Sequence, residues 1–461
     1  MESKSGSFPI LTAVCMLLCV SICAAQNTGK FWHVTDFHYD HTYSTSMLSC
    51  NKAVRPSRYG DYWCDSPWEL ITKAMGAMTR YYEDVDFLLW TGDTVAHIKD
   101  DNLTISINMD VMGNITKALK THFPTKTVYA TFGNHDYYPA DQFPDFNNII
   151  YNRTAEMWES WINDTDQLAN FRKGGYYTLK TQHGQRIVGL NTNLYYTSDK
   201  QTPGIKDPSD QLQWLRSVLQ KSKTDGEKVI ITAHIPPGIH TPTRDIWFHE
   251  EFIDPVNGVL KDFADVIVGM HFGHDHHDGF KIFYDSQDKA AAPLFVAPSV
   301  TPWRYKLPSG ETGPPHNPSV RLVTYDRDTG KHLNIEQLML DLVAANSAES
   351  ANFTLLYNFT QHYNVPDISA SSLQKLVTRM ASGSEGDSLL NDYFRFTTGG
   401  ADQGDKTCDR TCKSRFLCGF RHYKYAEFDA CVEGYVGSAV SVSASGLLII
   451  VLLALLTLMG N

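Results

Sequence analysis

The chain has 461 residues, of which 42% are hydrophobic and 20% charged, and its formal net charge is −11. This length allows one large hydrophobic core with a smaller appendage, and the composition is that of an ordinary globular protein. The acidic excess argues against a surface that binds a nucleic-acid polymer, because phosphate backbones demand an excess of Lys and Arg. It does not argue against a small phosphate-bearing substrate, which a metal ion could hold.

The N-terminal segment has the pattern of a targeting signal. After Lys4, the apolar run FPILTAVCMLLCVSICAA ends in small residues. This order predicts a secretory signal peptide over residues 1–25, cut near Ala24 or Ala25. A transmembrane anchor is the weaker alternative, because the run is short.

Short apolar runs then alternate with helical patterns. Five of the runs end in polar residues: KFWHVTDFHYD, DFLLWTGDTVAH, TVYATFGNHD, KVIITAHIPPG and ADVIVGMHFGHDHHD. Each run is short and rich in β-branched, aliphatic or aromatic residues, which predicts a buried strand. Between them, SPWELITKAMGAMTRYYED shows a capping-box order from Ser66 to Glu69, and TAEMWESWIN and SDQLQWLRSVLQKS carry apolar residues at helical spacing. The alternation predicts an α/β core with functional groups at strand ends.

The pattern changes after about Arg327. From Asn334 to Asp392 the strand-then-polar pattern is lost and helix-like segments follow, with a cysteine-bearing segment over 408–431. We therefore expect a catalytic domain over residues 26–333 and a helical C-terminal subdomain over residues 334–432.

The cysteines and sequons fit an oxidising compartment. Three of the nine cysteines fall in the predicted signal peptide. The other six permit 15 pairings, and local spacing favours Cys50–Cys64, Cys408–Cys412 and Cys418–Cys431, as disulfides rather than metal thiolates. Six Asn-x-Thr sequons predict a glycosylated exterior, at Asn102, Asn114, Asn152, Asn163, Asn352 and Asn358.

The C-terminal tail resembles a lipid-anchor attachment signal. The apolar block from Leu447 to Met459 has 13 residues and no Lys or Arg after it, whereas a spanning helix needs about 20 residues. Small residues Gly437, Ser438 and Ala439 precede a polar spacer. This order predicts a GPI-anchor signal over 433–461, which would place the protein on the outer leaflet of the plasma membrane. A retained single-span tail from Val436 onwards is the alternative.

The polar clusters at the strand ends share one kind of chemistry. They comprise carboxylate, imidazole and amide groups, the ligand types that a divalent transition metal accepts, at Asp36-x-His38, Gly92-Asp93, Gly133-Asn134-His135-Asp136, His234 and Gly273-His274-Asp275-His276. A single such cluster occurs by chance. Five in this order, each closing an apolar run, predict a metal site.

The order DxH, GDxxxH, GNHD, H and GHxH resembles the calcineurin-like metallophosphoesterase superfamily. The sequence GDTVAH ending at His97, the sequence AHIPPG, and CDRTC with a further cysteine pair resemble its acid sphingomyelinase-like phosphodiesterases, and the tail fits the lipid-anchored members. The resemblance implies a β-sandwich flanked by helices, in four αββα layers. Because about ten residues separate the predicted cleavage site from Asp36, we expect no saposin-like lipid-lifting domain.

The resemblance also implies the metal ligands. Asp36, His38 and His276 would hold one ion, Asn134, His234 and His274 the other, and Asp93 would bridge them, with zinc as the expected metal. Two such ions can activate a hydroxide between them and clamp phosphate oxygens. His135 and His97 would contact the phosphate and act in transition-state stabilisation or proton donation, and Asp136 would orient His135. Activity on the acidic side of neutral follows as an expectation.

Several other residues are expected to be structural or to have more than one possible role. His33, Trp158 and Trp161 are expected in the core. His277 is expected to lie next to the metal ligands without being a ligand itself. His240 and His249 lie in a segment that could line the site. Trp303 and Tyr305 could stack on a base or flank a headgroup, and Arg304 could contact a phosphate; packing is the alternative for the aromatic residues.

The favoured function is a secreted, surface-anchored, dinuclear-metal phosphodiesterase. Its substrates would be small phosphodiesters and phosphoanhydrides, such as nucleotides and CDP-choline-like molecules, and less readily phospholipid headgroups. A purple acid phosphatase needs a tyrosine ligand where Thr94 to His97 stand, and a 5′-nucleotidase needs a large further domain. The alternative of another class is an anchored module that binds membrane lipids and modulates surface receptors, with hydrolysis secondary. A monomer is expected in either case.

Overall fold

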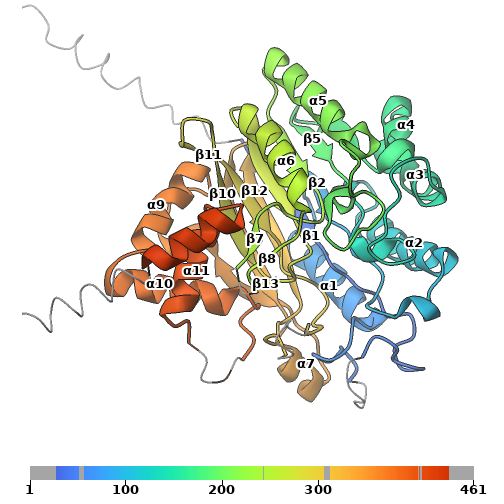
Figure 1. Cartoon of the computed structure of the whole chain (residues 1–461). Coiled ribbons are helices and arrows are strands. Elements are labelled where there is room, and N and C mark those ends of the chain that lie inside the picture. Colours follow the sequence, from blue (N-terminus) through green and yellow to red (C-terminus); the bar gives the residue numbers. More distant parts are fainter. Residues whose placement is uncertain are drawn as a thin grey trace, which may run out of the picture.

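The computed structural model describes residues 27–50, 57–241, 243–305, 312–402, 404 and 407–435. The predicted signal peptide and nearly all of the predicted anchor signal lie outside these residues. Within them, two six-stranded sheets and a small hairpin form the frame of the protein. Helices surround the sheets, as Figure 1 shows, so the predicted α/β architecture with sheets flanked by helices is confirmed.

The first sheet has the strand order β14-β13-β12-β1-β2-β3. Strands β1, β2 and β3 are parallel, whereas β12 pairs antiparallel with β1 and continues through β13 to β14. The strands are β1 (Thr28–Val34), β2 (Phe87–Trp90), β3 (Thr127–Ala130), β12 (Ser319–Asp326), β13 (His332–Met339) and β14 (Thr354–Asn358).

The second sheet has the strand order β10-β11-β9-β6-β5-β4. Its four inner strands β11, β9, β6 and β5 are parallel, and β10 and β4 are antiparallel edges. The strands are β4 (Tyr177–Lys180), β5 (Arg186–Gly189), β6 (Val229–Thr232), β9 (Ile267–Phe272), β10 (Gly279–Tyr284) and β11 (Ala290–Val296). The hairpin consists of β7 (Ile239–His240) and β8 (Asp245–Ile246).

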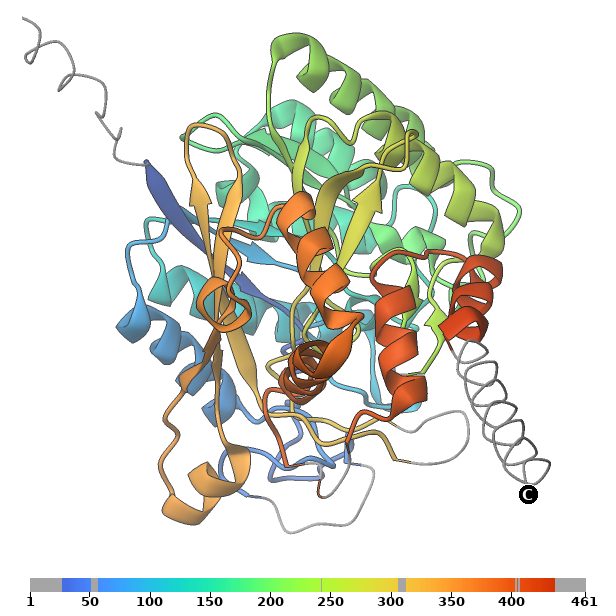
Figure 2. The same cartoon turned by 90° about the vertical axis from the view of Figure 1, so that its left-hand side faces the viewer.

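Two groups of helices lie on opposite sides of the strands. Figure 1 shows α9, α10 and α11 together on the side of β10 and β11, with α2, α3 and α4 on the opposite side, and Figure 2 shows the first group in front of the strands. The first six helices are α1 (Trp68–Tyr81), α2 (Ile105–His122), α3 (Ile149–Ile162), α4 (Thr165–Gly174), α5 (Gln211–Asp225) and α6 (Glu250–Asp262). The others are α7 (Leu342–Ala348), α8 (Phe359–Tyr363), α9 (Ala370–Met380), α10 (Gly383–Phe396) and α11 (Arg410–Gly419).

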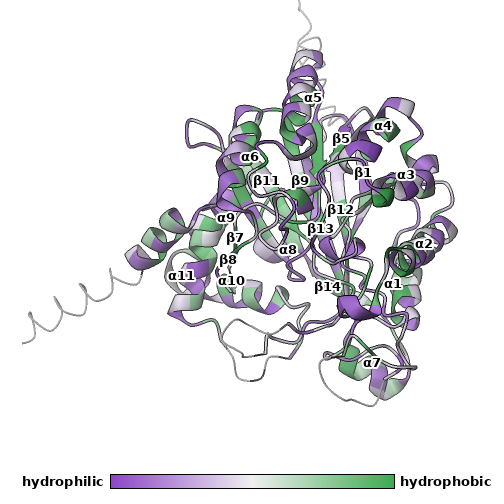
Figure 3. Cartoon of the chain, turned by 45° about the vertical axis from the view of Figure 1, so that its right-hand side comes forward, coloured by the Kyte–Doolittle hydropathy of each residue, from purple (hydrophilic) through white to green (hydrophobic). Residues whose placement is uncertain are grey.

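The core lies between and around the sheets. Figure 3 shows hydrophobic colour on the central strands and both colours on the surrounding helices, the pattern of amphipathic elements packed on one core. Trp158 and Trp161 are buried in it, as predicted. None of the helices in the described part of the chain is both long and apolar enough to cross a membrane.

Two local expectations differ from the structure. Pro67, not Ser66, is the N-cap of α1 and no side chain caps it; Glu69 pairs with Arg58 at 3.0 Å instead of closing a capping box. The division expected between residues 333 and 334 falls inside β13. β13 has buried and partly buried residues and β14 is partly exposed, so their mixed polar and apolar pattern conceals their membership of the first sheet.

The three predicted disulfides are present: Cys50–Cys64, Cys408–Cys412 and Cys418–Cys431. Two of them lie in the last region of the fold, where Cys412 and Cys418 both belong to α11. The sequence therefore predicted the covalent links correctly from local spacing.

Candidate metal centre

The predicted polar clusters meet at one edge of the two sheets. Asp36 and His38 follow β1, Asp93 follows β2, His234 follows β6, and the segment 273–278 follows β9. Asn134, His135 and Asp136 form a single 3₁₀ turn after β3. Because these strands are parallel, their carboxyl ends bring the side chains together, which is where α/β folds place their sites.

Two glycines allow the loops to approach backbone to backbone. A Cβ atom on Gly92 would lie 2.2 Å from the backbone nitrogen of Gly133, and one on Gly133 would lie 2.1 Å from the backbone nitrogen of Asp93. The loops after β1 and β2 are also joined, since Asp36 N donates to Gly92 O at 3.0 Å. Only glycine fits such contacts.

The candidate ligands sit on unusual backbone. Five of the seven have positive φ: Asp36 (50°), His38 (40°), Asp93 (54°), His274 (69°) and His276 (58°). L residues rarely adopt this conformation, and such outliers cluster where a site requires a special side-chain direction. His274 and His276 therefore do not share one side of an extended segment, and this turn conformation directs them to different partners.

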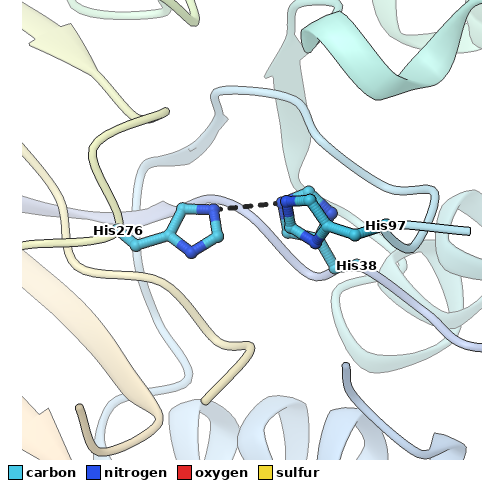
Figure 4. A group of neighbouring side chains, drawn as sticks. All are labelled: His38, His97 and His276. Atoms are coloured by element: carbon cyan, nitrogen blue, oxygen red, sulfur yellow. Dashed lines mark hydrogen bonds between the residues drawn. The ribbon is translucent and has the colours of Figure 1, made fainter. Parts of the chain in front are cut away.

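The first half-site consists of Asp36, His38 and His276 with Asp93. His38 Nε2 lies 3.7 Å from Asp36 Oδ1 and 3.4 Å from Asp93 Oδ2, and His276 Nε2 lies 3.4 Å from Asp36 Oδ1. Figure 4 shows the rings of His38 and His276 facing each other, with their Nε2 atoms 3.2 Å apart.

The second half-site consists of Asn134, His234 and His274 with Asp93. Asn134 Oδ1 lies 3.0 Å from His234 Nε2 and 2.9 Å from His274 Nδ1. His234 Nε2 lies 3.1 Å from Asp93 Oδ2. The same oxygen of Asp93 therefore faces both half-sites, the position that a bridging carboxylate requires.

The donor set fits two divalent ions. His38 Nδ1 donates to Val95 O at 2.8 Å and His234 Nδ1 donates to Thr91 O at 2.6 Å, so Nε2 of each ring faces the centre. Asp36 Oδ1 is buried there without a hydrogen-bond donor. In the metal-free site Asp93 outweighs burial and raises the pKa of the His38 and His234 rings, that of His234 to about 9, so a bound cation would take the place of protons on these rings. Within the described residues, the acidic and imidazole groups close enough to hold an ion are Asp36–His38–Asp93, Asp93–His234–His274 and His38–His97–His276.

The electrostatics of the buried carboxylates agree with this arrangement. Burial alone raises the pKa of Asp93, but His234 and His38 outweigh it and hold that pKa well below its usual range. Burial also raises the pKa of Asp36, but His276 foremost outweighs burial and holds that pKa below its usual range. Both groups are therefore anions, ready to balance positive charge.

His97 and His135 lie beside the ligands and face the same cleft. The ring of His97 stacks on His38 at 4.1 Å and on Trp303 at 3.8 Å between centroids. The ring of His135 lies 4.4 Å from that of His97, and its Nδ1 is buried without a partner. Burial, reinforced by His38, lowers the pKa of His97 well below its usual value, so this imidazole is neutral at rest.

Asp136 has a different role from the one expected. Its Oδ2 accepts from Gly133 N at 2.8 Å and its Oδ1 accepts from Thr94 N at 2.7 Å. Both oxygens are thus engaged by backbone, and they join the loops after β2 and β3. The prediction that Asp136 orients the His135 ring is corrected: the backbone amide of His135 is held by Asp93 Oδ1 at 2.9 Å.

Two carboxylates that support the site were not found from the sequence. Asp65 accepts from His97 N at 2.7 Å and lies 3.0 Å from His97 Nδ1. Asp141 Oδ1 accepts from Asn134 Nδ2 at 2.8 Å, which turns the amide oxygen of Asn134 towards the histidines. Asp65 stands 32 residues before His97, outside every motif, and no pattern in the sequence pointed to either residue.

A cleft of about 260 Å³ opens in front of the centre. Besides Asp93, Asn134 and the histidines, it is lined by Tyr196, His240, Thr243, Asp245, Trp247, Asp275, Trp303 and Tyr305.

The predictions for Trp303, Tyr305 and His240 as lining residues are thus supported. Arg304 instead donates to Gly313 O at 3.0 Å and packs over Trp63, and His249 contacts Asp199 O at 2.9 Å. His33 is buried, as expected, and His277 is buried as well.

The fold and centre define a class of protein, and the comparisons identify it. The model of the calcineurin-like phosphoesterase family matches residues 29–278, so the chain is a metal-dependent phosphoesterase of that family. The model of the acid sphingomyelin phosphodiesterase C-terminal region matches residues 289–438. Within the family, the chain belongs to the acid sphingomyelinase-like phosphodiesterases, and it is a phosphodiester hydrolase.

Relatives match over most of their length. Acid sphingomyelinase-like phosphodiesterase 3b of Mus musculus is 36% identical over 426 residues, with 89% of this chain and 91% of the relative covered. The corresponding protein of Homo sapiens is 35% identical, with 94% and 96% covered. Cyclic GMP-AMP phosphodiesterase SMPDL3A of Homo sapiens is 33% identical, with 88% and 90% covered.

Proposed function

We propose that this protein is a secreted phosphodiesterase of the cell surface that holds two zinc ions and hydrolyses small phosphodiesters and phosphoanhydrides. The observation that carries the proposal is the convergence of two half-sites on one oxygen of Asp93. Seven side chains from five separate loops supply nitrogen and oxygen donors, which suit zinc.

Asp36, His38 and His276 would hold one ion and Asn134, His234 and His274 the other, with Asp93 between them. When bound, such a pair of cations neutralises phosphate oxygens and activates water for attack on phosphorus. The protein's own contribution is to fix these ligands: Val95 O and Thr91 O set the tautomers of His38 and His234, and Asp141 sets the amide of Asn134.

His97 is the proposed proton donor to the leaving oxygen: neutral at rest, it would take up a proton from the attacking water and pass it on. Its Nδ1 is engaged by the buried carboxylate of Asp65, which stabilises an imidazolium in the same way that a carboxylate orients a catalytic histidine elsewhere. Burial raises the pKa of Asp65 to about 7, and His38 and the His97 amide oppose that shift. His135 faces the same cleft and is proposed to stabilise charge on the phosphate in the transition state.

The cleft walls support nucleotides and CDP-choline-like molecules as the substrate class. Trp303, Trp247, Tyr196 and Tyr305 offer ring faces beside the centre, and such faces stack on bases or contact a cationic headgroup. A relative's name states that it acts on cyclic GMP-AMP, which supports nucleotide diesters here. Phospholipid headgroups are proposed as poorer substrates, because a lipid must first leave its bilayer.

Secretion and anchoring form part of the same proposal. The three disulfides suit an oxidising compartment. Five of the six sequon asparagines are exposed and Asn358 is half-buried, so glycans could attach to the exterior of a monomer.

A GPI anchor on the outer leaflet predicts that a phosphatidylinositol-specific phospholipase C releases the protein from intact cells. Retention after treatment that releases a known anchored marker would argue for a membrane-spanning tail.

A substrate panel on purified, secreted protein lacking residues 433–461 tests the reaction. The panel comprises cyclic GMP-AMP, CDP-choline, bis-p-nitrophenyl phosphate, p-nitrophenyl phosphate and sphingomyelin vesicles. We expect turnover of the first three and little of the last two. Cleavage of the monoester alone, or of no diester by zinc-loaded protein, would refute the proposal.

A further inference from the structure

The loop over residues 273–278 carries one ligand for each half-site and needs support. His274 and His276 both have positive φ, 69° and 58°, and neither is a glycine. Backbone in this conformation persists only where the surrounding structure over-determines it. Part of that support is local, since His274 N donates to Asp36 Oδ2 at 3.1 Å and Ser299 N donates to His276 O at 3.2 Å.

The last residue of the loop, Asp278, is held from three directions. Its carboxylate accepts a short hydrogen bond from Arg321 Nη2 on one oxygen and from the Tyr357 hydroxyl on the other. Its backbone amide donates to Thr397 O at 2.9 Å. Asp278 is 8% exposed and Arg321 is fully buried, so these contacts are shielded from water and from salt.

Arg321 is itself fixed. Its Nε donates to Gln337 Oε1 at 3.0 Å and its Nη1 donates to Val296 O at 3.0 Å. Gln337 Nε2 in turn donates to Val320 O at 3.0 Å. Each nitrogen of the guanidinium therefore has a partner. The guanidinium cannot turn away from Asp278 without losing hydrogen bonds inside the core.

These contacts cross from one sheet to the other. Arg321 lies on β12 and Tyr357 on β14, both in the first sheet, whereas the loop that ends at Asp278 connects β9 to β10 in the second. Arg321 and Tyr357 also lie within residues 289–438, the region that the C-terminal family model matches. The metal ligands all lie before it.

We propose that Arg321 and Tyr357 are positioning residues that act through Asp278 to hold His276 in place for its metal ion. The inference rests on the proposed metal centre and extends it, because the C-terminal region then completes the centre instead of packing beside it. Stability alone accounts poorly for the arrangement, since a buried ion pair adds little compared with apolar packing of similar volume. Partners behind a metal ligand commonly set its affinity.

Metal titration of single variants tests this assignment. Tyr357→Phe removes one hydroxyl, and Arg321→Met removes the donors while keeping an unbranched side chain. Metal-free full-length protein is titrated with Zn²⁺ in a calorimeter and with Co²⁺ by visible absorption. We expect both variants to bind one of the two ions about 10-fold to 100-fold more weakly than wild type, and added metal to restore their activity.

Arg327→Gln is the matched control. Arg327 pairs with Asp86 through two hydrogen bonds, of 2.9 and 2.7 Å, just beyond the other end of β12. This variant should lower the melting temperature without changing either metal affinity. The inference is overturned if Tyr357→Phe and Arg321→Met keep wild-type affinity for both ions; should Arg321→Met fail to fold, Tyr357→Phe decides alone. Failure of wild type to bind two ions would refute the proposed function instead.

Discussion

Asp65 contacts His97 twice, through the backbone amide at 2.7 Å and through ring Nδ1 at 3.0 Å. The carboxylate is fully buried and also accepts from the Thr301 hydroxyl at 2.9 Å. With Nδ1 engaged and one ring face covered by Trp303, His97 is held in a single orientation at the cleft. Orientation of this kind is what general acid catalysis requires.

Replacing Asp65 with Asn should therefore impair proton donation by His97. For a diester with a poorly leaving alkoxide, we expect kcat to fall roughly 100-fold. With p-nitrophenolate as the leaving group, which needs no proton, the loss should be much smaller. The neighbouring Asp61→Asn, at a carboxylate that accepts from Trp63 N and not from His97, serves as control. An equal fall in kcat for both leaving groups would show that Asp65 supports the structure of the site rather than proton donation by His97.

Asp141 should affect metal binding through its hydrogen bond with Asn134. Asp141→Ala frees the amide that Asp141 now orients at 2.8 Å, and we expect the affinity for one ion to fall about 10-fold or more. Isothermal titration of metal-free protein measures it. The control is Asp100→Ala, because the Asp100 carboxylate accepts from Ala140 N in the same region, at 3.1 Å, and not from Asn134. Unchanged affinity in Asp141→Ala would remove the assigned role.

Three histidines in the core should make the protein acid-sensitive. His271 Nε2 lies 2.8 Å from His332 Nε2, and His271 Nδ1 lies 3.4 Å from His33 Nδ1. Burial lowers the pKa of His332 to about 4, and it lowers the pKa values of His33 and His271 well below the ordinary value. Each ring is therefore neutral in the folded protein and takes up a proton on unfolding.

Proton linkage determines how the free energy of unfolding changes with pH. A lowered pKa in the folded state means that stability is fully present above about pH 6.5 and falls as the pH drops towards 4. His332 alone should account for about 3 kcal/mol of that loss. Urea unfolding of His332→Gln at several pH values should show a shallower decline than wild type, whereas the exposed His41→Gln should not. A decline of equal steepness in His332→Gln would contradict the assignment.

The sequence predicted the seven candidate ligands because each lies in a short motif directly after an apolar strand. It also predicted the disulfides, whose partners are close in the chain. Asp65, Asp141 and Asp278 could not be found in this way, since each acts through a contact that only the tertiary fold creates. The strands β13 and β14 were missed because these antiparallel strands carry polar or partly exposed residues and lack the continuous apolar run that marks the inner strands.

The central claim is that the chain binds two metal ions and needs them for turnover. Elemental analysis of the purified protein, with diesterase activity measured before and after exhaustive chelation, tests it most directly. The account predicts two zinc ions per chain, loss of activity on chelation, recovery with added Zn²⁺, and fewer bound ions in Asp93→Asn. Full activity in protein free of metal would contradict it.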